Sequence, residues 1–199
     1  MLDIGDRPIL WHIMKIYSYY GMNEFIVCCG YKGYVIKEYF ANYFLHNSDV
    51  TFDLRANKME LHSQNSEPWK VTLVDTGDST LTGGRLRRVR DYLDKDKPFC
   101  FTYGDGVADI NLNKLIDHHK SSGCQATLTA VQPPGRYGAL NLDGNLVTKF
   151  VEKADNDQAW INGGFFVLEP SVIDLIDKDD CMWEQSPLNF LAGCNQLSA

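Results

Sequence analysis

Asp105 is the side chain whose surroundings in the sequence most favour chemistry. It stands between Gly104 and Gly106, directly after the apolar and aromatic stretch 99–103, and a helical pattern opens a few residues later at Leu112. This order predicts a buried strand, a tight loop and a helix. Because ligands of open α/β sheets collect outside the carboxyl ends of the strands, we expect this carboxylate to meet one. The alternative is a turn residue in a hairpin, since Asp-Gly is a strong turn signal.

A polar, glycine-rich loop at residues 76–84 is the second candidate, and it leads into a predicted helix. Free N–H groups at the start of such a helix favour an anion. Arg85 falls in the first turn, where a cation opposes the helix dipole, so we expect it to face a negative partner. The alternative is a capped surface helix with a solvated basic face.

Two later stretches carry polar side chains or glycines at strand ends. Glu152-Lys153 closes one predicted strand, and Asn162-Gly163-Gly164 opens the next, where the paired glycines would let a ligand approach the backbone closely. The alternatives are a solvated charge pair for the first stretch and a β-bulge for the second.

The elements that must position these residues alternate between helices and strands. Helices are predicted at 8–20, 34–44, 112–121, from 170 onward and near 187–191, and strands at 24–29, 70–75, 99–103, 126–131, 146–153 and 161–168. A hairpin around Ala56-Asn57 predicts a small β insertion. The chain opens with neither the strand nor the glycine-rich phosphate loop with which a doubly wound sheet normally begins. We therefore predict one domain, residues 1–199, with an open, mostly parallel Rossmann-like sheet flanked by helices and its first βα unit missing.

Local signals add further expectations. Asp6 is expected to cap the first helix and Gly21 to end it. Asp109 is expected to cap the helix that follows the Asp105 loop. His118 and His119 are adjacent and so lie on different faces of that helix, which is more typical of surface residues than of ligands.

Composition narrows the class of protein. The sequence is 44% hydrophobic and 23% charged, ordinary values for a globular chain, and no apolar run approaches the ~20 residues that span a bilayer. The net charge of −7 argues against a nucleic-acid-binding surface. The start of the sequence has neither a basic nor an apolar signal region, so a cytoplasmic location is expected. The six cysteines lack metal-type spacing and are expected to be free, mostly buried thiols.

Several short motifs occur in the order seen in one enzyme family. They are Cys29-Gly30-Tyr31-Lys32-Gly33, Val74-Asp75-Thr76-Gly77, Thr82-Gly83-Gly84-Arg85-Leu86, Tyr103-Gly104-Asp105-Gly106, Pro134-Gly135-Arg136-Tyr137-Gly138, Glu152-Lys153 and Ile161-Asn162-Gly163-Gly164-Phe165-Phe166. Together they resemble the sugar-nucleotide pyrophosphorylases, and most of all the glucose-1-phosphate cytidylyltransferases, over the chain up to about Leu188. The resemblance implies Mg²⁺-dependent transfer from CTP to α-D-glucose 1-phosphate, giving CDP-glucose and pyrophosphate. It also implies a homo-oligomeric enzyme that serves the synthesis of surface polysaccharide such as O-antigen. The charge and composition described above predict no nucleic-acid or membrane partner.

The resemblance assigns a role to each candidate residue. Asp105 and Lys153 are the implied catalytic residues, Asp105 as a magnesium ligand and Lys153 as the lysine that meets the sugar phosphate. Nucleotide contacts are implied for Thr80, Arg85 and Gly104, and sugar-phosphate contacts for Gly138, Glu152, Lys153, Asn162 and Gly163.

These residue types suit the reaction. A sugar phosphate is already a competent nucleophile, so the protein has mainly to align it with the α-phosphorus and to offset the charge of two polyanions. Mg²⁺ usually keeps several waters and takes one or two carboxylates, so Asp105 suffices as one ligand and leaves room for another.

Two departures from the family pattern leave alternatives open. The family's glycine-rich signature loop precedes the stretch that matches residues 1–5, and a second metal-binding aspartate and an assembly region follow the match. One alternative is therefore a truncated or degenerate member that folds and binds sugar phosphate only. Another is a metal-dependent glycosyltransferase, which would want an Asp-x-Asp pair where this chain has Asp105-Gly106-Val107. A dinucleotide-dependent oxidoreductase is disfavoured because no G-x-G-x-x-G follows a strand.

Overall fold

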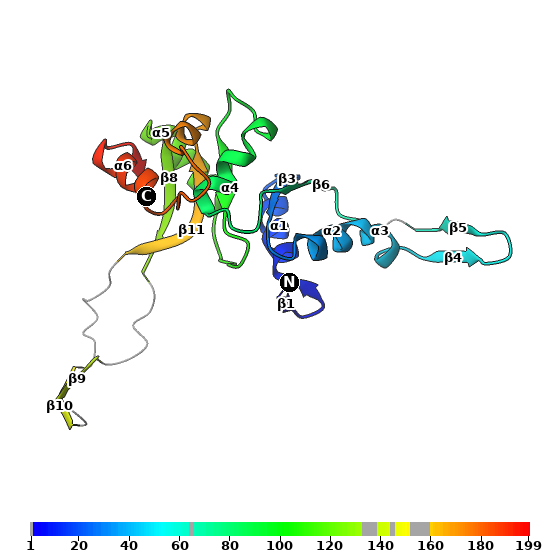
Figure 1. The fold of residues 1–199 in the computed structure, drawn as a ribbon, viewed down its shortest axis with the longest axis horizontal. Helices are drawn as coiled ribbons and strands as arrows, with labels where there is room; N and C mark the ends of the chain where they lie inside the picture. The colour runs from blue at the N-terminus through cyan, green and yellow to red at the C-terminus, as the bar shows by residue number, and fades with distance from the viewer. Residues whose placement is uncertain (1, 64–65, 133–138, 144–145, 152–159) are drawn as a thin grey trace.

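The structure is a computed structural model that describes residues 2–63, 66–132, 139–143, 146–151 and 160–199 (Figure 1). Three predicted site residues, Gly138, Glu152 and Lys153, lie outside the described residues. The described helices are all too short or too polar to cross a bilayer.

The N-terminal half contains a two-stranded parallel sheet with a helix beside it. A short hairpin of β1 (Asp3–Ile4) and β2 (Arg7–Pro8) precedes α1 (Ile9–Tyr19), whose N-cap is Pro8 rather than the predicted Asp6. β3 (Glu24–Cys29) pairs in parallel with β6 (Lys70–Asp75), both at the predicted positions. Gly21, with φ +83°, ends α1 as expected because this backbone conformation is open to glycine at little cost.

The stretch between β3 and β6 forms the predicted insertion. The expected single helix is divided into α2 (Gly33–Ala41) and α3 (Tyr43–His46). β4 (Val50–Asp53) and β5 (Lys58–Leu61) form the predicted antiparallel hairpin, which extends away from the body of the molecule (Figure 1).

The C-terminal half forms a four-stranded sheet in the order β12-β8-β11-β7. Its strands are β7 (Phe99–Thr102), β8 (Ala126–Val131), β11 (Ile161–Leu168) and β12 (Leu197–Ser198), and β11 is antiparallel to both β7 and β8. The helices of this half are α4 (Thr82–Arg88), η1 (Arg90–Tyr92), α5 (Leu112–Ser122), η2 (Pro170–Leu175) and α6 (Ser186–Gly193). A separate antiparallel pair consists of β9 (Ala139–Asp143) and β10 (Leu146–Val151).

The α/β class is confirmed, but the expected continuous sheet is divided in two. A cleft of about 870 Å³ separates β3 from β7, and residues of α1 and α4 contribute to its lining. Among the described strands, β3 pairs only with β6 and β7 only with β11, so one edge of each strand is unpaired.

The cleft walls are largely uncharged. Burial raises the pKa of the Cys28 and Cys100 thiols to about 11, and both side chains line the cleft. They are therefore protonated at neutral pH. All six cysteines are free, as expected, although Cys194 is exposed.

Two expectations about α5 are wrong. The side chain of Asn111, and not that of Asp109, caps the helix by accepting a hydrogen bond from the Lys114 backbone N–H at 3.0 Å. His119 is buried instead of exposed, because its Nδ1 lies 2.8 Å from the Thr127 hydroxyl in β8. Adjacent histidines must indeed face different ways, and here one of the two faces points into the core.

Candidate active site

Asp105, Gly104 and Arg85 line the same cleft. Asp105 and Gly104 follow the end of β7 and are exposed, whereas Arg85 reaches the cleft from α4 and is half-buried. The structure thus brings together a carboxylate, a backbone without a side chain and a cation from distant parts of the sequence. This is the expected arrangement at the carboxyl end of a strand.

Arg85 is fixed by neutral groups. Its Nη1 donates to the Thr76 hydroxyl at 2.6 Å and its Nη2 to the Asp78 carbonyl oxygen at 3.3 Å. The guanidinium also lies against Gly30, where an added Cβ would come within 2.4 Å of Nη1. Within the described part of the chain no carboxylate forms an ion pair with Arg85. The positive charge is held at the cleft and is open to an anionic ligand.

The N–H groups at the start of α4 are not free, so that expectation is wrong. Gly83 and Gly84 donate to the Cys181 carbonyl oxygen at 3.0 and 3.2 Å, and Leu81 donates to the Asp179 carbonyl oxygen at 2.9 Å. The segment 179–183 therefore takes the place that the sequence suggested for an anion. Close packing explains these glycines, since an added Cβ on Gly84 would lie 2.2 Å from the Asp179 carbonyl oxygen.

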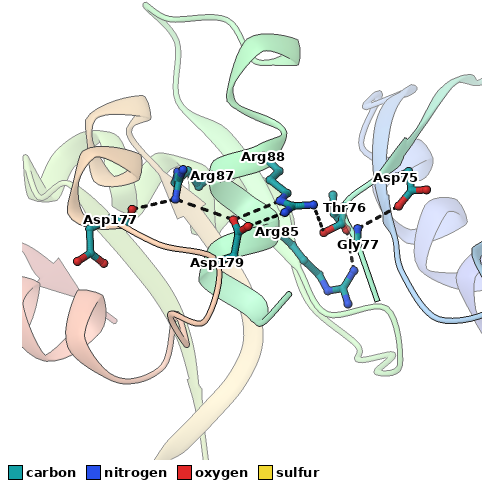
Figure 2. A network of polar contacts seen from close by, with 8 residues as sticks. All are labelled: Asp75, Thr76, Gly77, Arg85, Arg87, Arg88, Asp177 and Asp179. Carbon is teal, nitrogen blue, oxygen red and sulfur yellow. Dashed lines mark hydrogen bonds and ion pairs between the residues drawn. The ribbon is translucent and has the colours of Figure 1, made fainter. Parts of the chain in front are cut away.

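Two further arginines of α4 hold the helix in place (Figure 2). Arg88 forms an ion pair with Asp179 and donates through Nη1 to the Thr76 carbonyl oxygen at 3.0 Å. Arg87 donates to the Asp177 carbonyl oxygen at 2.9 Å. The hydrogen bond from Arg88 is the main reason that the pKa of the Asp179 carboxyl lies below its usual range. These contacts join α4 both to the loop after β6 and to the segment after η2.

Thr80 and Gly163 are not among the residues that line the cleft. Thr80 is buried, and its hydroxyl would lie 3.0 Å from a Cβ added to Gly77. Gly163 packs on β8, where an added Cβ would lie 3.0 Å from the Thr129 carbonyl oxygen. Packing therefore explains Gly163 without a ligand. The pairing of β11 with β8 also shifts register between Asn162 and Phe166, which favours the β-bulge alternative for this stretch.

Asn162 is linked to the cleft through Tyr103. Its Oδ1 accepts from the Gly164 backbone N–H at 2.8 Å, and its Nδ2 donates to the Tyr103 hydroxyl at 3.3 Å. Tyr103 itself lines the cleft. The exposed amide of Asn162 is thereby held close to the end of β7.

Sequence reasoning missed Tyr103 and Glu184 as parts of the site. The Tyr103 hydroxyl donates to Glu184 at 2.7 Å, and burial, followed by this hydrogen bond, raises the pKa of the tyrosine. Tyr103 had a signal, since it directly precedes Gly104-Asp105. Glu184 had none, because it comes from a stretch of the sequence without periodicity.

Two described carboxylates line the cleft, Glu24 in β3 and Asp105 after β7, and Glu24 forms an ion pair with Lys70 at 3.1 Å. Among the described residues no group of three or more His, Cys, Asp or Glu side chains could enclose a metal ion. One carboxylate fits Mg²⁺, which is usually bound through one or two carboxylates together with substrate phosphates and water. It fits Zn²⁺ poorly, since zinc sites need three or four protein ligands.

The chain is similar to known proteins over its whole length. The family model described as nucleotidyl transferase matches residues 1–197. A protein of Salmonella typhi named glucose-1-phosphate cytidylyltransferase is 62% identical over 199 residues, which cover 100% of this chain and 77% of that protein. A mannose-1-phosphate guanyltransferase of Saccharomyces cerevisiae is 27% identical over 99% of this chain and 51% of its own length.

Solved structures share the fold. The crystal structure of HddC from Yersinia pseudotuberculosis in complex with GMP-PN superposes with a TM-score of 0.63 at 22% identity, covering 93% of this chain and 73% of that one. An apo UDP-glucose pyrophosphorylase superposes with a TM-score of 0.62 at 14% identity, covering 96% of this chain and 78% of that one. At such identities the likeness shows the fold alone.

Proposed function

Because this chain belongs to the nucleotidyl transferase family, we propose that it transfers a cytidylyl group from CTP to α-D-glucose 1-phosphate and releases pyrophosphate. The observation that carries the proposal is the meeting of Arg85, Gly104 and Asp105 at one cleft, with the arginine charge not neutralised by a described carboxylate. The choice of cytosine and glucose is supported by the whole-chain relative of that name.

The reaction requires the protein to align the two substrates and to offset their negative charge. A phosphate oxygen of glucose 1-phosphate forms a bond to the α-phosphorus of CTP, and the bond from that phosphorus to the bridging oxygen breaks. Pyrophosphate leaves with the electron pair. Arg85, held rigidly by Thr76, offsets phosphate charge at the cleft. Gly104 lets the nucleotide approach the backbone, and Asn162 orients the sugar.

Asp105 is the residue that we assign to Mg²⁺. The carboxylate is exposed at the mouth of the cleft, where substrate phosphates and water would complete its ligands. When bound, the ion offsets negative charge on the phosphates.

The remaining roles rest on the resemblance. We assign Lys153 to the sugar phosphate, Gly138, Glu152 and Gly163 to the sugar, and Thr80 to the nucleotide. For Thr80 and Gly163 the packing described above offers an explanation without a ligand, so their variants should change stability more than substrate affinity. A homo-oligomeric state, a cytoplasmic location and a part in surface-polysaccharide synthesis stay predictions from the same resemblance.

The Gly104→Ala variant distinguishes a glycine that contacts the nucleotide from one that is needed only for the fold. An added Cβ meets nothing within 4 Å, and the φ of Gly104 is not positive, so the free energy of unfolding should change by less than ~0.5 kcal/mol. If the nucleotide approaches this backbone, the methyl group should raise the KM for CTP about tenfold, the effect of ~1.4 kcal/mol of overpacking.

Gly106→Ala is the matched control for that variant, because its Cβ also meets nothing within 4 Å. It should leave both the KM and the stability unchanged. An unchanged KM for CTP in Gly104→Ala would remove Gly104 from the nucleotide site.

The test of the proposed function is pyrophosphate release with glucose 1-phosphate, Mg²⁺ and each of CTP, UTP and dTTP in turn. We expect CTP to give a kcat/KM at least ~10-fold above the others, since a site that hydrogen-bonds the cytosine edge leaves polar groups unpaired with another base. Equal rates with all three would contradict the assignment of CTP.

An inactive, ligand-binding protein is the second candidate. It is favoured by the two unpaired strand edges at the cleft, because the described residues alone leave the centre of the sheet open. The assay therefore compares the 199-residue chain with a chimera that adds the segments of the Salmonella typhi relative that this chain does not span. We expect turnover in the chimera, and turnover there with none in the 199-residue chain would mean that cytidylyl transfer needs the added segments. Equal rates in both forms would exclude the inactive candidate.

A further inference from the structure

Glu184 connects two cleft-lining elements that are far apart in the sequence. One carboxylate oxygen accepts from the Tyr103 hydroxyl and the other from the Thr82 hydroxyl, both at 2.7 Å. Thr82 and Tyr103 line the cleft. Glu184 is not among its lining residues, so it acts on the cleft through these two partners.

The partners of Glu184 lead directly to residues assigned to the substrates. Thr82 begins α4, the helix that carries Arg85, and its hydroxyl also accepts from the Trp183 backbone N–H at 2.9 Å. Tyr103 immediately precedes Gly104-Asp105. The carboxylate therefore links the first turn of the Arg85 helix to the start of the Asp105 loop.

The two hydrogen bonds that Glu184 accepts from Thr82 and Tyr103, here called the Glu184 bridge, also affect Asn162, the residue assigned to the sugar. The Tyr103 hydroxyl donates its proton to Glu184 and so presents lone pairs to the Nδ2 of Asn162 at 3.3 Å. If Glu184 no longer accepted that proton, the tyrosine hydroxyl could rotate and the Asn162 amide would lose its fixed partner. One carboxylate thus orders three side chains of the C-terminal half, two of which line the cleft.

We propose that Glu184 is a positioning residue that holds Asp105 and Arg85 at a fixed separation and keeps Asn162 oriented. The proposal rests on the function proposed above for this cleft. Two hydrogen bonds to one ionised group define both a distance and an orientation, and hydrogen bonds to a charged acceptor are stronger than those between neutral groups. Misplacing a reacting group by about 1 Å can lower a rate ~100-fold, which is why a residue outside the cleft can control turnover.

Glu184→Gln and Glu184→Ala test the two halves of the bridge. The glutamine oxygen can still accept from Tyr103, but its amide nitrogen cannot accept the proton of Thr82, so that proton loses its charged acceptor. Alanine removes both hydrogen bonds. In the active form of the enzyme we expect kcat to fall about 10-fold for Gln and about 100-fold for Ala, with the KM for CTP within about threefold of the parent.

Thr82 variants show whether the effect belongs to the bridge. Thr82→Val removes the donor and should lower kcat at least as much as Glu184→Gln does, because it also removes the acceptor of the Trp183 backbone N–H. Thr82→Ser keeps the hydroxyl and should retain the parent kcat. The double variant Thr82→Val with Glu184→Gln should be no slower than Thr82→Val alone, since both changes break the contact between Thr82 and Glu184. Glu169→Gln is the matched control, because Glu169 is also half-buried and hydrogen-bonded, but to His119 away from the cleft.

A binding measurement separates this inference from the proposed function. By calorimetry we expect Glu184→Ala to raise the Kd for glucose 1-phosphate about fivefold through the loss of Asn162 orientation. Suppose that the parent protein binds glucose 1-phosphate and that Glu184→Ala raises this Kd, but that no pyrophosphate is released from CTP. That result would contradict cytidylyl transfer and support the role of Glu184. Parent-like kcat and Kd in both Glu184 variants would overturn the inference while leaving the function intact.

The remaining outcomes are also decisive. If Glu184→Ala does not fold, the kcat values of Glu184→Gln and Thr82→Val test the inference instead. Additive losses in the double variant, or a lowered melting temperature with an unchanged kcat, would reduce Glu184 to a stabilising residue and overturn the inference. A parent protein that neither turns over nor binds glucose 1-phosphate contradicts both proposals.

Discussion

Replacing Asp105 by Asn should lower kcat at least ~100-fold while leaving the fold intact. The amide has the shape of the carboxylate but lacks the charge that a hard divalent cation requires. Because Asp105 is exposed and follows the end of β7, the change removes no described core contact. Steady-state rates in the chimera at several Mg²⁺ concentrations are the measurement, and part of the loss should be recovered at high Mg²⁺.

Asp109→Asn is the control for this variant. Asp109 is an exposed carboxylate four positions further along the same loop, and it is not among the residues of the cleft. It should keep the parent rate. If Asp105→Asn also kept it, Asp105 would not bind the metal in this reaction.

Gly84→Ala should cause the largest loss of stability among the glycine variants. The added Cβ would lie 2.2 Å from the Asp179 carbonyl oxygen, a backbone atom that cannot move aside as a flexible side chain can. Shifting it would disturb the ion pair between Asp179 and Arg88 and the hydrogen bond from Gly84 to Cys181. We expect the free energy of unfolding to fall by about 2–3 kcal/mol, as measured by urea denaturation.

Gly193→Ala provides the comparison for this variant. Gly193 is the last residue of α6, and its added Cβ would meet nothing within 4 Å. Its stability should stay within ~0.5 kcal/mol of the parent or rise slightly, because alanine is the better helix former. Equal stability of the Gly84 and Gly193 variants would mean that segment 179–183 does not pack on α4 as described.

Most elements could be predicted because each has a local signal. β3, β6 and β8 lie at the predicted residues, since apolar and β-branched runs bounded by turn residues define strands well. The hairpin of β4 and β5 turns at Asn57, which has φ +51°, a conformation that asparagine adopts more readily than most residues.

The division of the sheet could not be predicted, because pairing is not a local property. The strand pattern of β7 is the same whether its second edge is paired or not. The same holds for the capping of α5, where Asp109 and Asn111 both suit the position and only the backbone decides.

Three of the predicted site residues line one cleft, and their roles stay predictions. Asp105, Gly104 and Arg85 meet at one cleft because strand ends and helix starts converge in α/β folds. The N–H groups before Arg85 were expected to be free, but a local pattern cannot show that the distant segment 179–183 accepts their hydrogen bonds. Glu184 was missed because its proposed role depends on hydrogen bonds to residues more than 80 positions away in the sequence.

The most direct test of the account follows the α-phosphorus itself. The chimera is incubated with Mg²⁺, glucose 1-phosphate and CTP that is radiolabelled at its α-phosphorus, and the products are separated. We predict that the label appears in CDP-glucose in amounts equal to the pyrophosphate released, and that Asp105→Asn abolishes both. Label that stays in CTP, or that appears as CMP without CDP-glucose, would contradict cytidylyl transfer at this cleft.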